Sequence, residues 1–526
     1  MKQIILVILD GFGYSSFTKG NAIFSARKPN FNILDRRWPT ANLQASGIAV
    51  GLPWREEGNS EVGHVTIGTG RVVWQYFPRI NFSISDGSFF SNSAFLAAVQ
   101  HVKRRGSTAH IIGLVSTGTV HSALGHCRSL IDLFEQEGVG HIRLHVITDA
   151  KDAPPNEAGY LLKFLQKDLS ERSPHTKIAS IIGRNFALDR DSHWDRTQRA
   201  YRLFTEGEGE KISDPVSYIE SQYEKGFHDD EIEPAVVVDS NGDYEGVIQD
   251  GDAVVFFDFR EDSERQIVRA FALDDFNKFS RKKKDLLIVT MTAYEDGLPV
   301  LVAFNRISIK DPLARVVSDL GCRQLHVAET GKYAHVTYFL NGLHEKAFPG
   351  EEWLLIPSER EAGLDRFPVM KAKDIKRAII KRLDSFDFIA ANFANADQVG
   401  HTGNFNSTVK AIEVLDAVMG DLMKEVDKRG SLMVITADHG NAEEKFDFST
   451  GGIRTEHTSN PVPFYLFGKG WELKKARSEK ELSRLRLDVA GVLTDVAPTI
   501  LELVGVVKPA EMTGRSLLPY LRSQIV

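Results

Sequence analysis

The chain has 526 residues, 42% of them hydrophobic and 26% charged, which is typical of a globular protein with two or three domains. The 64 Lys and Arg against 71 Asp and Glu give a formal net charge of −7, which argues against bulk nucleic-acid binding and against a basic, membrane-attracting surface. Its two cysteines form no CxxC pattern, and no apolar run approaches the ~20 residues of a membrane span. We therefore expect a cytoplasmic protein that binds neither nucleic acid nor membrane.

Ten short apolar runs predict β-strands buried on both faces, because they are continuously apolar rather than alternating. They are residues 3–10, 110–117, 141–148, 176–183, 252–259, 286–293, 323–330, 386–395, 431–438 and 463–468. Amphipathic helical stretches lie between most of them; residues 407–429, for example, place five apolar side chains on one face. Strands that alternate with helices predict α/β domains with mostly parallel sheets.

Charged and imidazole side chains follow many of the predicted strands. Ligands bind beyond the carboxyl ends of the strands in open α/β sheets, so these side chains are candidate site residues. In chain order they are Asp10, Asp149, Asp152, Arg184, Arg190, Arg260, Lys332, Asp397, His401, Asp438 and His439. The strand-end side chains from Asp149 to Arg260 are mainly cationic. Asp10 and the strand-end side chains after residue 390 are Asp and His. We therefore expect one domain that holds metal and one that holds an anion.

The metal-type residues come from both ends of the chain, so the cationic domain is expected to be an insertion in the other. We place the metal-binding domain at residues 1–76 and 310–526. The inserted domain, which would bind the anionic substrate, is placed at residues 77–309. No internal repeat or low-complexity tract interrupts this division.

Ser60 lies in a polar, glycine-broken stretch, residues 58–64 (GNSEVGH). A serine hydroxyl is a poor nucleophile at neutral pH unless a base or a metal ion activates it, and the stretch taken alone is typical of a structural turn. With six further residues it forms a set of three carboxylates, three imidazoles and a hydroxyl: Asp10, Ser60, Asp397, His401, Asp438, His439 and His457. Seven ligands fit two ions better than one, and the mixed oxygen and nitrogen donors suit Mn²⁺ or Zn²⁺. Each residue alone has an ordinary structural role, but their joint occurrence at strand ends favours a metal site.

The chain resembles a known family along nearly its whole length. The motifs that carry the resemblance are LDGFG, GNSEVGH, IGTGR, ITDAKDAPP, GRNFALDRD, ETGKYAHVTYFLNG, NFANADQVGHTG, ADHGNAE, EHTSNPVP and APTILELVGVVKPAEMTG. In these motifs it is similar to the cofactor-independent (2,3-bisphosphoglycerate-independent) phosphoglycerate mutases of the alkaline phosphatase superfamily. The resemblance implies an alkaline phosphatase-like metal domain built from both chain ends and an inserted α/β transferase domain.

The resemblance also implies the reaction and the metal ligands. The expected enzyme is a monomeric isomerase that interconverts 3-phosphoglycerate and 2-phosphoglycerate through a phosphoserine at Ser60, without bisphosphoglycerate. One Mn²⁺ would be held by Asp397, His401 and His457. The second would be held by Asp10, Ser60, Asp438 and His439. The ligand types would also accept Zn²⁺ or Co²⁺.

The same resemblance implies the substrate residues of the inserted domain. They are His121, Lys151, Asp152, Arg184, Arg190 and Arg260, with Lys332 to stabilise the phosphoryl group in transfer. Arginine offers a planar fork to carboxylate and phosphate, and Asp152 could act as general base toward a glycerate hydroxyl.

The match departs from the family pattern in the inserted domain. Lys151 and Ser263 stand where the family has arginine, and residues 116–123 read STGTVHSA rather than SDGGVHSH. These departures motivate an alternative, a related metal-dependent phosphomutase or phosphohydrolase that acts on another phosphorylated small acid. A non-catalytic binding protein is disfavoured because every metal ligand and Ser60 are present.

Overall fold

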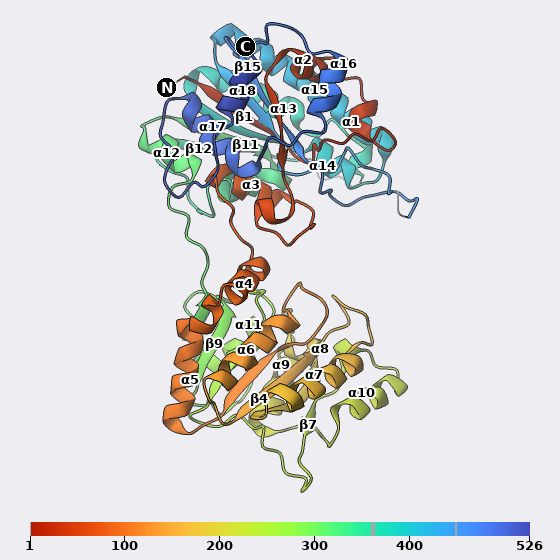
Figure 1. Ribbon diagram of the computed structural model, residues 1–526, viewed down its shortest axis with the longest axis vertical. Coiled ribbons are helices and arrows are strands. Elements are labelled where there is room, and N and C mark those ends of the chain that lie inside the picture. Colours follow the sequence, from red (N-terminus) through yellow and green to blue (C-terminus); the bar gives the residue numbers. More distant parts are fainter. Residues whose placement is uncertain (1, 359–362, 448–449, 526) are drawn as a thin grey trace. The chain divides into compact units, whose positions relative to one another are not determined.

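The computed structural model describes residues 2–358, 363–447 and 450–525 (Figure 1). The chain divides into two compact units. The first comprises residues 1–74 and 307–526, and the second comprises residues 75–306. None of the helices in the described residues has the length and apolar composition of a membrane span.

The first unit is built on an eight-stranded mixed sheet with the order β12-β11-β13-β1-β14-β15-β2-β16. Its strands are β1 (Ile4–Leu9), β2 (Thr40–Gln44), β11 (Gln324–Glu329), β12 (Glu351–Ile356), β13 (Phe388–Phe393), β14 (Leu432–Thr436), β15 (Val462–Gly468) and β16 (Gly491–Val492). The central strand β1 pairs in parallel with β13, Ile4 opposite Phe388, and with β14, Ile4 opposite Leu432. Only β15 runs antiparallel to its neighbours β14 and β2. The carboxyl ends of β13, β1 and β14 therefore lie side by side.

Helices connect and flank the strands of this sheet. They are α1 (Ala22–Ser25), α2 (Pro29–Arg37), α3 (Ser60–Thr69), α12 (Leu313–Asp319), α13 (Ala372–Arg382), α14 (Asn395–Gly400), α15 (Phe405–Arg429), α16 (Glu479–Leu485), α17 (Val496–Leu503) and α18 (Leu518–Ser523). The apolar face predicted for residues 407–429 belongs to α15, and it packs in one core with β1. Asn404 caps the start of α15 by accepting the N–H of Ser407, and Gly430 ends the helix with φ of 64°.

The second unit is built on its own eight-stranded mixed sheet, with the order β10-β9-β8-β3-β4-β5-β7-β6. Its strands are β3 (Ala109–Leu114), β4 (Ile142–Thr148), β5 (Thr176–Gly183), β6 (Glu210–Ile212), β7 (Ala235–Val237), β8 (Ala253–Phe256), β9 (Leu287–Thr292) and β10 (Leu301–Phe304). Only the pairing of β5 with β7 is antiparallel. Its helices are α4 (Tyr76–Ser85), α5 (Ser93–Arg105), α6 (Leu124–Gln136), α7 (Ala158–Arg172), α8 (Arg184–Ala187), α9 (Trp194–Glu206), α10 (Pro215–Glu224) and α11 (Arg265–Ala272).

The predicted α/β class with mostly parallel sheets is confirmed, and each of the ten apolar runs contains a strand. The sequence did not predict β2, β6, β7, β10, β12 and β16. These strands are short or lie near the sheet edges, where one face meets solvent and the apolar run is broken. The strand β12, for example, is only partly buried along its length.

Candidate functional site

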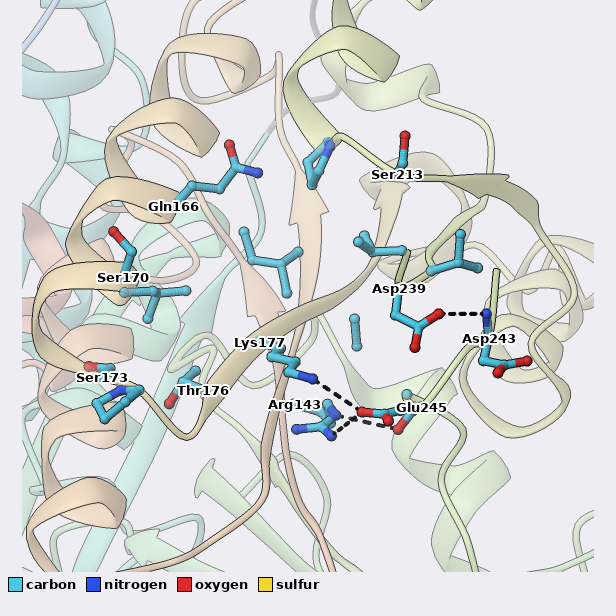
Figure 2. Close-up of a pocket in the computed structure, with 18 residues that line it drawn as sticks. Arg143, Gln166, Ser170, Ser173, Thr176, Lys177, Ser213, Asp239, Asp243 and Glu245 are labelled. Atoms are coloured by element: carbon cyan, nitrogen blue, oxygen red, sulfur yellow. Dashed lines mark hydrogen bonds and ion pairs between the residues drawn. The ribbon is translucent and has the colours of Figure 1, made fainter. Parts of the chain in front are cut away.

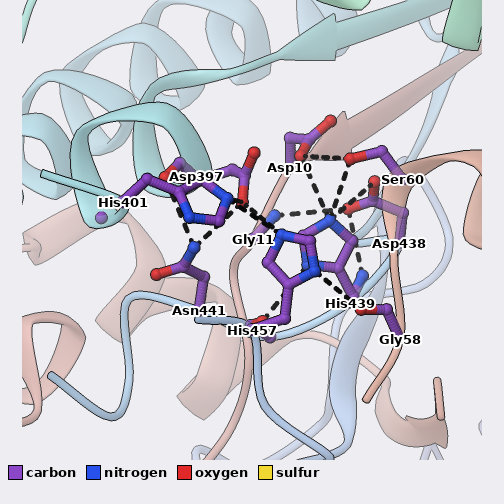
Figure 3. A network of polar contacts seen from close by, with 12 residues as sticks. Asp10, Gly11, Gly58, Ser60, Asp397, His401, Asp438, His439, Asn441 and His457 are labelled. Atoms are coloured by element: carbon purple, nitrogen blue, oxygen red, sulfur yellow. Dashed lines mark hydrogen bonds and ion pairs between the residues drawn. The ribbon is translucent and has the colours of Figure 1, made fainter. Parts of the chain in front are cut away.

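The predicted metal ligands of the first unit lie together at the carboxyl ends of its three central parallel strands (Figure 3). Asp10 directly follows β1, Asp397 lies in α14 just after β13, and Asp438 and His439 follow β14. Ser60 is the first residue of α3, whose N-cap Asn59 accepts the N–H of Val62 at 3.0 Å. The local sequence thus places the serine hydroxyl at a helix start, beside the strand ends that carry the carboxylates.

Two glycines allow these segments to approach one another. Gly11 has φ of 71°, and a Cβ built on it would lie 2.6 Å from the Cα of Asp397. A Cβ on Gly63, one turn into α3, would lie 2.5 Å from the carbonyl oxygen of Asp438. Side chains at either position would push the ligand-bearing segments apart, so these glycines of the LDGFG and GNSEVGH motifs serve packing.

The first donor group consists of Asp397, His401 and His457. The two Nε2 atoms lie 3.0 Å from each other, and each lies 3.2 Å from Oδ1 of Asp397. Each Nδ1 donates to a carbonyl, that of Thr455 at 2.7 Å for His401 and that of Gly58 at 2.8 Å for His457. Both rings therefore turn Nε2 toward the carboxylate. A carboxylate oxygen and two imidazole nitrogens that converge this closely form a donor set suited to a divalent cation.

The second donor group consists of Asp10, Ser60, Asp438 and His439, of which Asp10, Asp438 and His439 are fully buried. Nε2 of His439 lies 3.0 Å from Oγ of Ser60 and 3.5 Å from a carboxylate oxygen of each aspartate. Oδ2 of Asp438 accepts no hydrogen bond from the described residues, although the imidazole of His64 lies 3.2 Å away. A buried carboxylate oxygen without a hydrogen-bond donor fits an electropositive ligand.

The electrostatics of the cluster follow from these contacts. Burial lowers the pKa of His439, but Asp438 and its neighbours outweigh it and raise that pKa to about 10. Against the cost of burial, His439 and His64 hold the pKa of Asp438 below its ordinary range, and Lys332 does so for Asp397. The aspartates therefore stay ionised and draw positive charge to the site.

Lys332 follows β11 and lies between the two donor groups. Its Nζ donates to Oγ of Ser60 at 2.6 Å and lies 2.8 Å from both Oδ2 of Asp397 and Oδ1 of Asp10. Burial opposes its charge, but these carboxylates raise its pKa above the ordinary value. A permanent cation therefore contacts the candidate nucleophile directly.

Two residues that bridge ligands were missed at the level of sequence. His64 is fully buried, and its Nδ1 lies 2.8 Å from the carbonyl of Ser60 and 3.2 Å from Asp438. Asn392, on β13, donates to Oδ2 of Asp10 at 2.6 Å and to Nε2 of His64 at 3.1 Å. His64 ends the GNSEVGH motif, so its place in that motif was a usable signal. Nothing distinguished Asn392 from other polar residues on a buried strand.

Glu443, which was also missed, binds three of the ligand-bearing segments together. Its carboxylate accepts the N–H of Gly13 at 3.0 Å and that of Asn441 at 2.9 Å, and it accepts the hydroxyl of Thr458. These three residues follow Asp10, His439 and His457 in the chain. The side-chain amide of Asn441 in turn donates to Oδ1 of Asp397 at 3.0 Å. The hydrogen bonds fix the loops on which the ligands are mounted.

The predicted substrate residues of the second unit form a separate cluster at the carboxyl ends of its strands. Nη1 of Arg184 donates to Asp149 and to Oδ2 of Asp152 at 2.7 Å, and its Nη2 lies 3.0 Å from Nε2 of His121. Burial and the neighbouring Arg184 lower the pKa of His121 to about 4, so this imidazole is neutral at neutral pH. Asp149 was among the strand-end candidates, but the resemblance gave it no role in substrate binding.

The other predicted cations of this unit lie outside the Arg184 group: Arg190 and Arg260 form a pair, and Lys151 lies apart from them. Arg190 and Arg260 share the carboxylate of Asp262, at 2.7 and 2.8 Å, and were not predicted to meet there. Lys151 donates instead to Oδ1 of Asn185 at 2.6 Å. The structure thus brings His121, Asp152 and Arg184 into one hydrogen-bonded group, and Arg190 with Arg260 into another.

A pocket of about 560 Å³ in the second unit involves none of these residues (Figure 2). It lies at the amino ends of β4 and β5, whereas the substrate cluster follows their carboxyl ends. Its cations, Arg143 and Lys177, both pair with Glu245, at 3.0 and 3.2 Å. The pocket offers no unneutralised cation among the residues that line it, so it is a poorer anion site than the substrate cluster.

Comparison with known proteins gives two family matches and many full-length relatives. The family described as BPG-independent PGAM N-terminus matches residues 80–296, and type I phosphodiesterase / nucleotide pyrophosphatase matches residues 328–460. A 2,3-bisphosphoglycerate-independent phosphoglycerate mutase of Moorella thermoacetica is 43% identical over 519 residues, 98% of either chain. Another such protein, from Methanosarcina barkeri, is 44% identical over 521 residues, again 98% of either chain. The solved structure of Leishmania mexicana phosphoglycerate mutase at low cobalt concentration superposes with a TM-score of 0.61 at 28% identity, covering 98% of this chain and 97% of that chain.

Proposed function

The chain belongs to the family of 2,3-bisphosphoglycerate-independent phosphoglycerate mutases, and from this membership we propose how its own residues carry out the reaction. It is an isomerase that interconverts 3-phosphoglycerate and 2-phosphoglycerate without bisphosphoglycerate. One observation carries the assignment of the nucleophile: the hydroxyl of Ser60 contacts Lys332, Asp10 and His439 at 2.6, 3.2 and 3.0 Å in a buried cluster of carboxylates and imidazoles.

The reaction depends on metal, and the donor sets fit two divalent ions, for which we propose Mn²⁺. Asp397, His401 and His457 would hold one ion, and Asp10, Ser60, Asp438 and His439 the other. Bound there, the ions would stabilise the serine alkoxide and offset the charge of the phosphoryl oxygens. Zn²⁺ and Co²⁺ suit the same donors.

Ser60 is the phosphoryl acceptor in the first half of the cycle. Its Oγ forms a bond to phosphorus, the bond between phosphorus and O3 of the glycerate breaks, and O3 takes up the proton of Asp152, which enters this half in its protonated form. Lys332 keeps Oγ in place through its 2.6 Å hydrogen bond and brings a positive charge to the transferring group. Asp10, 3.2 Å from Oγ, is the acceptor placed for the serine hydroxyl proton.

The second unit holds the glycerate and serves the second half of the cycle. There the O2 hydroxyl attacks the phosphoserine, the bond between Oγ and phosphorus breaks, and Asp152 accepts the hydroxyl proton. His121 and Arg184 form the hydrogen-bonded group around Asp152. Arg190, Arg260 and Lys151 supply further positive charge for the carboxylate and phosphate of the substrate. We propose that residues 1–76 and 310–526 form the metal-binding domain and residues 77–309 the substrate-binding domain, in a monomer of the cytoplasm.

The test is to incubate the Mn²⁺-loaded protein with 3-phosphoglycerate, without bisphosphoglycerate, and to measure 2-phosphoglycerate and inorganic phosphate in the same samples. We expect 2-phosphoglycerate to form far faster than phosphate. Phosphate release that dominates over isomerisation would instead identify a phosphohydrolase, the alternative that Lys151 and Ser263 motivate. Arg190→Gln should raise the KM for 3-phosphoglycerate. The control is Arg202→Gln: Arg202 lies on α9 and pairs with Glu208, and its substitution should leave the KM unchanged.

A further inference from the structure

Ser263 occupies a position where the family has arginine, and its side chain contacts the imidazole of His121. Ser263 is 1% exposed, and its hydroxyl hydrogen-bonds Nδ1 of the ring. The two loops are also joined through the backbone, because the carbonyl of His121 accepts the N–H of Phe259 at 2.8 Å and that of Arg260 at 3.3 Å. The serine hydroxyl is therefore held in a fixed position beside the ring.

The other side of the ring decides which nitrogen carries the proton. Nε2 of His121 lies 3.0 Å from Nη2 of Arg184. A guanidinium can only donate, so Nε2 must present its lone pair to this contact. The ring is neutral, since burial and Arg184 lower its pKa to about 4, and its one proton must then be on Nδ1. Ser263 is the group that accepts this proton.

The alternative tautomer is less compatible with the same contacts. It would place a proton on Nε2, which could be donated to Oδ2 of Asp152 at 3.3 Å. That proton would meet the N–H of Arg184 at 3.0 Å, and Oδ2 of Asp152 already accepts from Nη1 of Arg184 at 2.7 Å. The serine hydroxyl can accept as well as donate, so the arginine determines the direction of its hydrogen bond.

The tautomer of His121 determines which N–H groups of Arg184 remain available to a ligand. Nη1 of the guanidinium is used by Asp149 and Asp152, and one N–H of Nη2 is used by His121. Among the described residues, the Nε–H and the second N–H of Nη2 have no hydrogen-bond partner, although Arg184 is only 7% exposed. The Nε of Arg184 is not among the fully buried atoms that lack a partner, so these donors are accessible to solvent and an anion can accept from them. Three partners fix the guanidinium, and two donors remain for an anion.

We propose that Ser263 is a positioning residue that fixes His121 as its Nδ1–H tautomer, so that Nε2 accepts from Arg184 and the free N–H groups of this guanidinium are presented to the anionic substrate. The consequence for catalysis rests on the proposed function, whereas the tautomer itself does not.

The proton position can be measured directly in the full-length protein. With ¹⁵N-labelled histidine, a long-range ¹H–¹⁵N spectrum separates ring nitrogens that carry a proton from those with a lone pair, and the His121→Asn variant assigns the signals of this ring. We expect a proton-bearing Nδ1 and a lone-pair Nε2 at pH 7. A proton-bearing Nε2 in the unmodified protein would overturn the proposal without any further variant.

Three substitutions test the role of the hydroxyl. Ser263→Ala should move signal intensity toward the Nε2–H form and raise the KM for 3-phosphoglycerate on the order of tenfold, as expected for loss of one orienting hydrogen bond, with a smaller effect on kcat. Ser263→Thr keeps a hydroxyl and should restore both readouts. Ser122→Ala is the matched control: it removes the buried hydroxyl next to His121 that donates to the carbonyl of Leu114 at 2.5 Å, not to the ring. It should leave the His121 spectrum unchanged.

The outcomes separate this proposal from the proposed function. An unchanged His121 spectrum in Ser263→Ala, or an equal change in Ser122→Ala, would refute the tautomer-fixing role. A changed spectrum with an unchanged KM would refute the consequence for the substrate. If the unmodified protein converted no 3-phosphoglycerate, the proposed function would fail, but the spectra would still decide whether Ser263 fixes His121.

Discussion

Lys332 is the residue whose charge lies closest to the proposed nucleophile. It is 6% exposed, donates to Oγ of Ser60 and contacts two of the proposed metal ligands, Asp10 and Asp397. Burying the ammonium group of Lys332 costs desolvation energy, which the surrounding carboxylates offset. They do so without a phosphoryl group in the site. Its place is therefore better explained by catalysis than by stability.

We expect Lys332→Met to lower kcat by roughly 10²- to 10³-fold, the usual effect of removing one group that stabilises transition-state charge. Metal content should be retained, because all seven proposed ligands remain. Steady-state kinetics of the Mn²⁺-loaded variant measures the loss. Lys376→Met, which removes the lysine paired with Asp421 at 2.5 Å, is the control and should keep full activity. A Lys332→Met enzyme with unchanged kcat would exclude the proposed role.

Asp258 carries a pH dependence of stability that is independent of the metal ligands. It is fully buried after β8; Oδ1 accepts the N–H of Leu114 at 2.8 Å, and Oδ2 accepts no hydrogen bond from the described residues. Burial raises its pKa from 3.8 to about 7. Its neighbour Glu264, also buried and bonded to the Tyr294 hydroxyl at 2.7 Å, has a pKa well above the ordinary value for the same reason.

Between about pH 4 and 7 the unfolded chain releases the Asp258 proton while the folded chain keeps it. The stabilisation is therefore complete below the unfolded pKa and is lost as the pH rises through about 7. Asp258→Asn removes the titration, so its Tm should fall less between pH 5 and 8 than that of the unmodified protein. Thermal unfolding measured by circular dichroism checks this. Asp275→Asn, at an exposed position in the same unit, should retain the full fall; equal slopes in all three proteins would contradict the assignment.

At the scale of elements, the proposed metal ligands lie on loops that Glu443 holds together. Its carboxylate accepts hydrogen bonds from segments that follow β1, β14 and the loop of His457. We expect Glu443→Gln to weaken Mn²⁺ binding on the order of 10- to 100-fold, the typical cost of losing an outer contact of a metal site. Calorimetric titration with Mn²⁺ measures it. The control is Glu472→Gln, at an exposed pair with Arg37, which should bind Mn²⁺ like the unmodified protein. Unchanged Mn²⁺ affinity in Glu443→Gln would show that the loops are held in other ways.

The sequence predicted the central elements better than the peripheral ones. The runs that became β1, β13 and β14 are buried on both faces, so their composition alone marks them as strands. The partly exposed β12 has no such signature. In the same way, the proximity of the candidate metal ligands could be predicted because Asp and His gather at strand ends. The contacts of Glu443 and Asn392 could not, since both depend on which loops meet in space.

The departures in the second unit show the same limit. Ser263 was recognised as a change from arginine, but its hydrogen bond to His121 required the path of the 259–263 loop. The pairing of Arg190 and Arg260 through Asp262 joins two arginines 70 positions apart in the chain. Such contacts follow from the sheet order rather than from any local spacing.

At the scale of the whole molecule, the chain leaves one compact unit, builds another and returns. The second unit begins at Gln75 and ends at Arg306, and Arg79 near its start donates to the carbonyl of Asn305 near its end at 2.6 Å. An insertion whose ends lie together can be accommodated without disturbing the sheet that hosts it. This arrangement gives each unit its own core and brings the proposed metal ligands from both ends of the chain together.

The central claim is that Ser60 accepts the phosphoryl group. The most direct measurement is to mix Mn²⁺-loaded protein with 3-phosphoglycerate in the absence of bisphosphoglycerate, quench in acid, and locate the phosphate by peptide mass spectrometry while phosphorus NMR follows the product. We predict phosphate on Ser60 together with 2-phosphoglycerate in solution, and neither in Ser60→Ala. Formation of 2-phosphoglycerate by Ser60→Ala at the unmodified rate would contradict the claim.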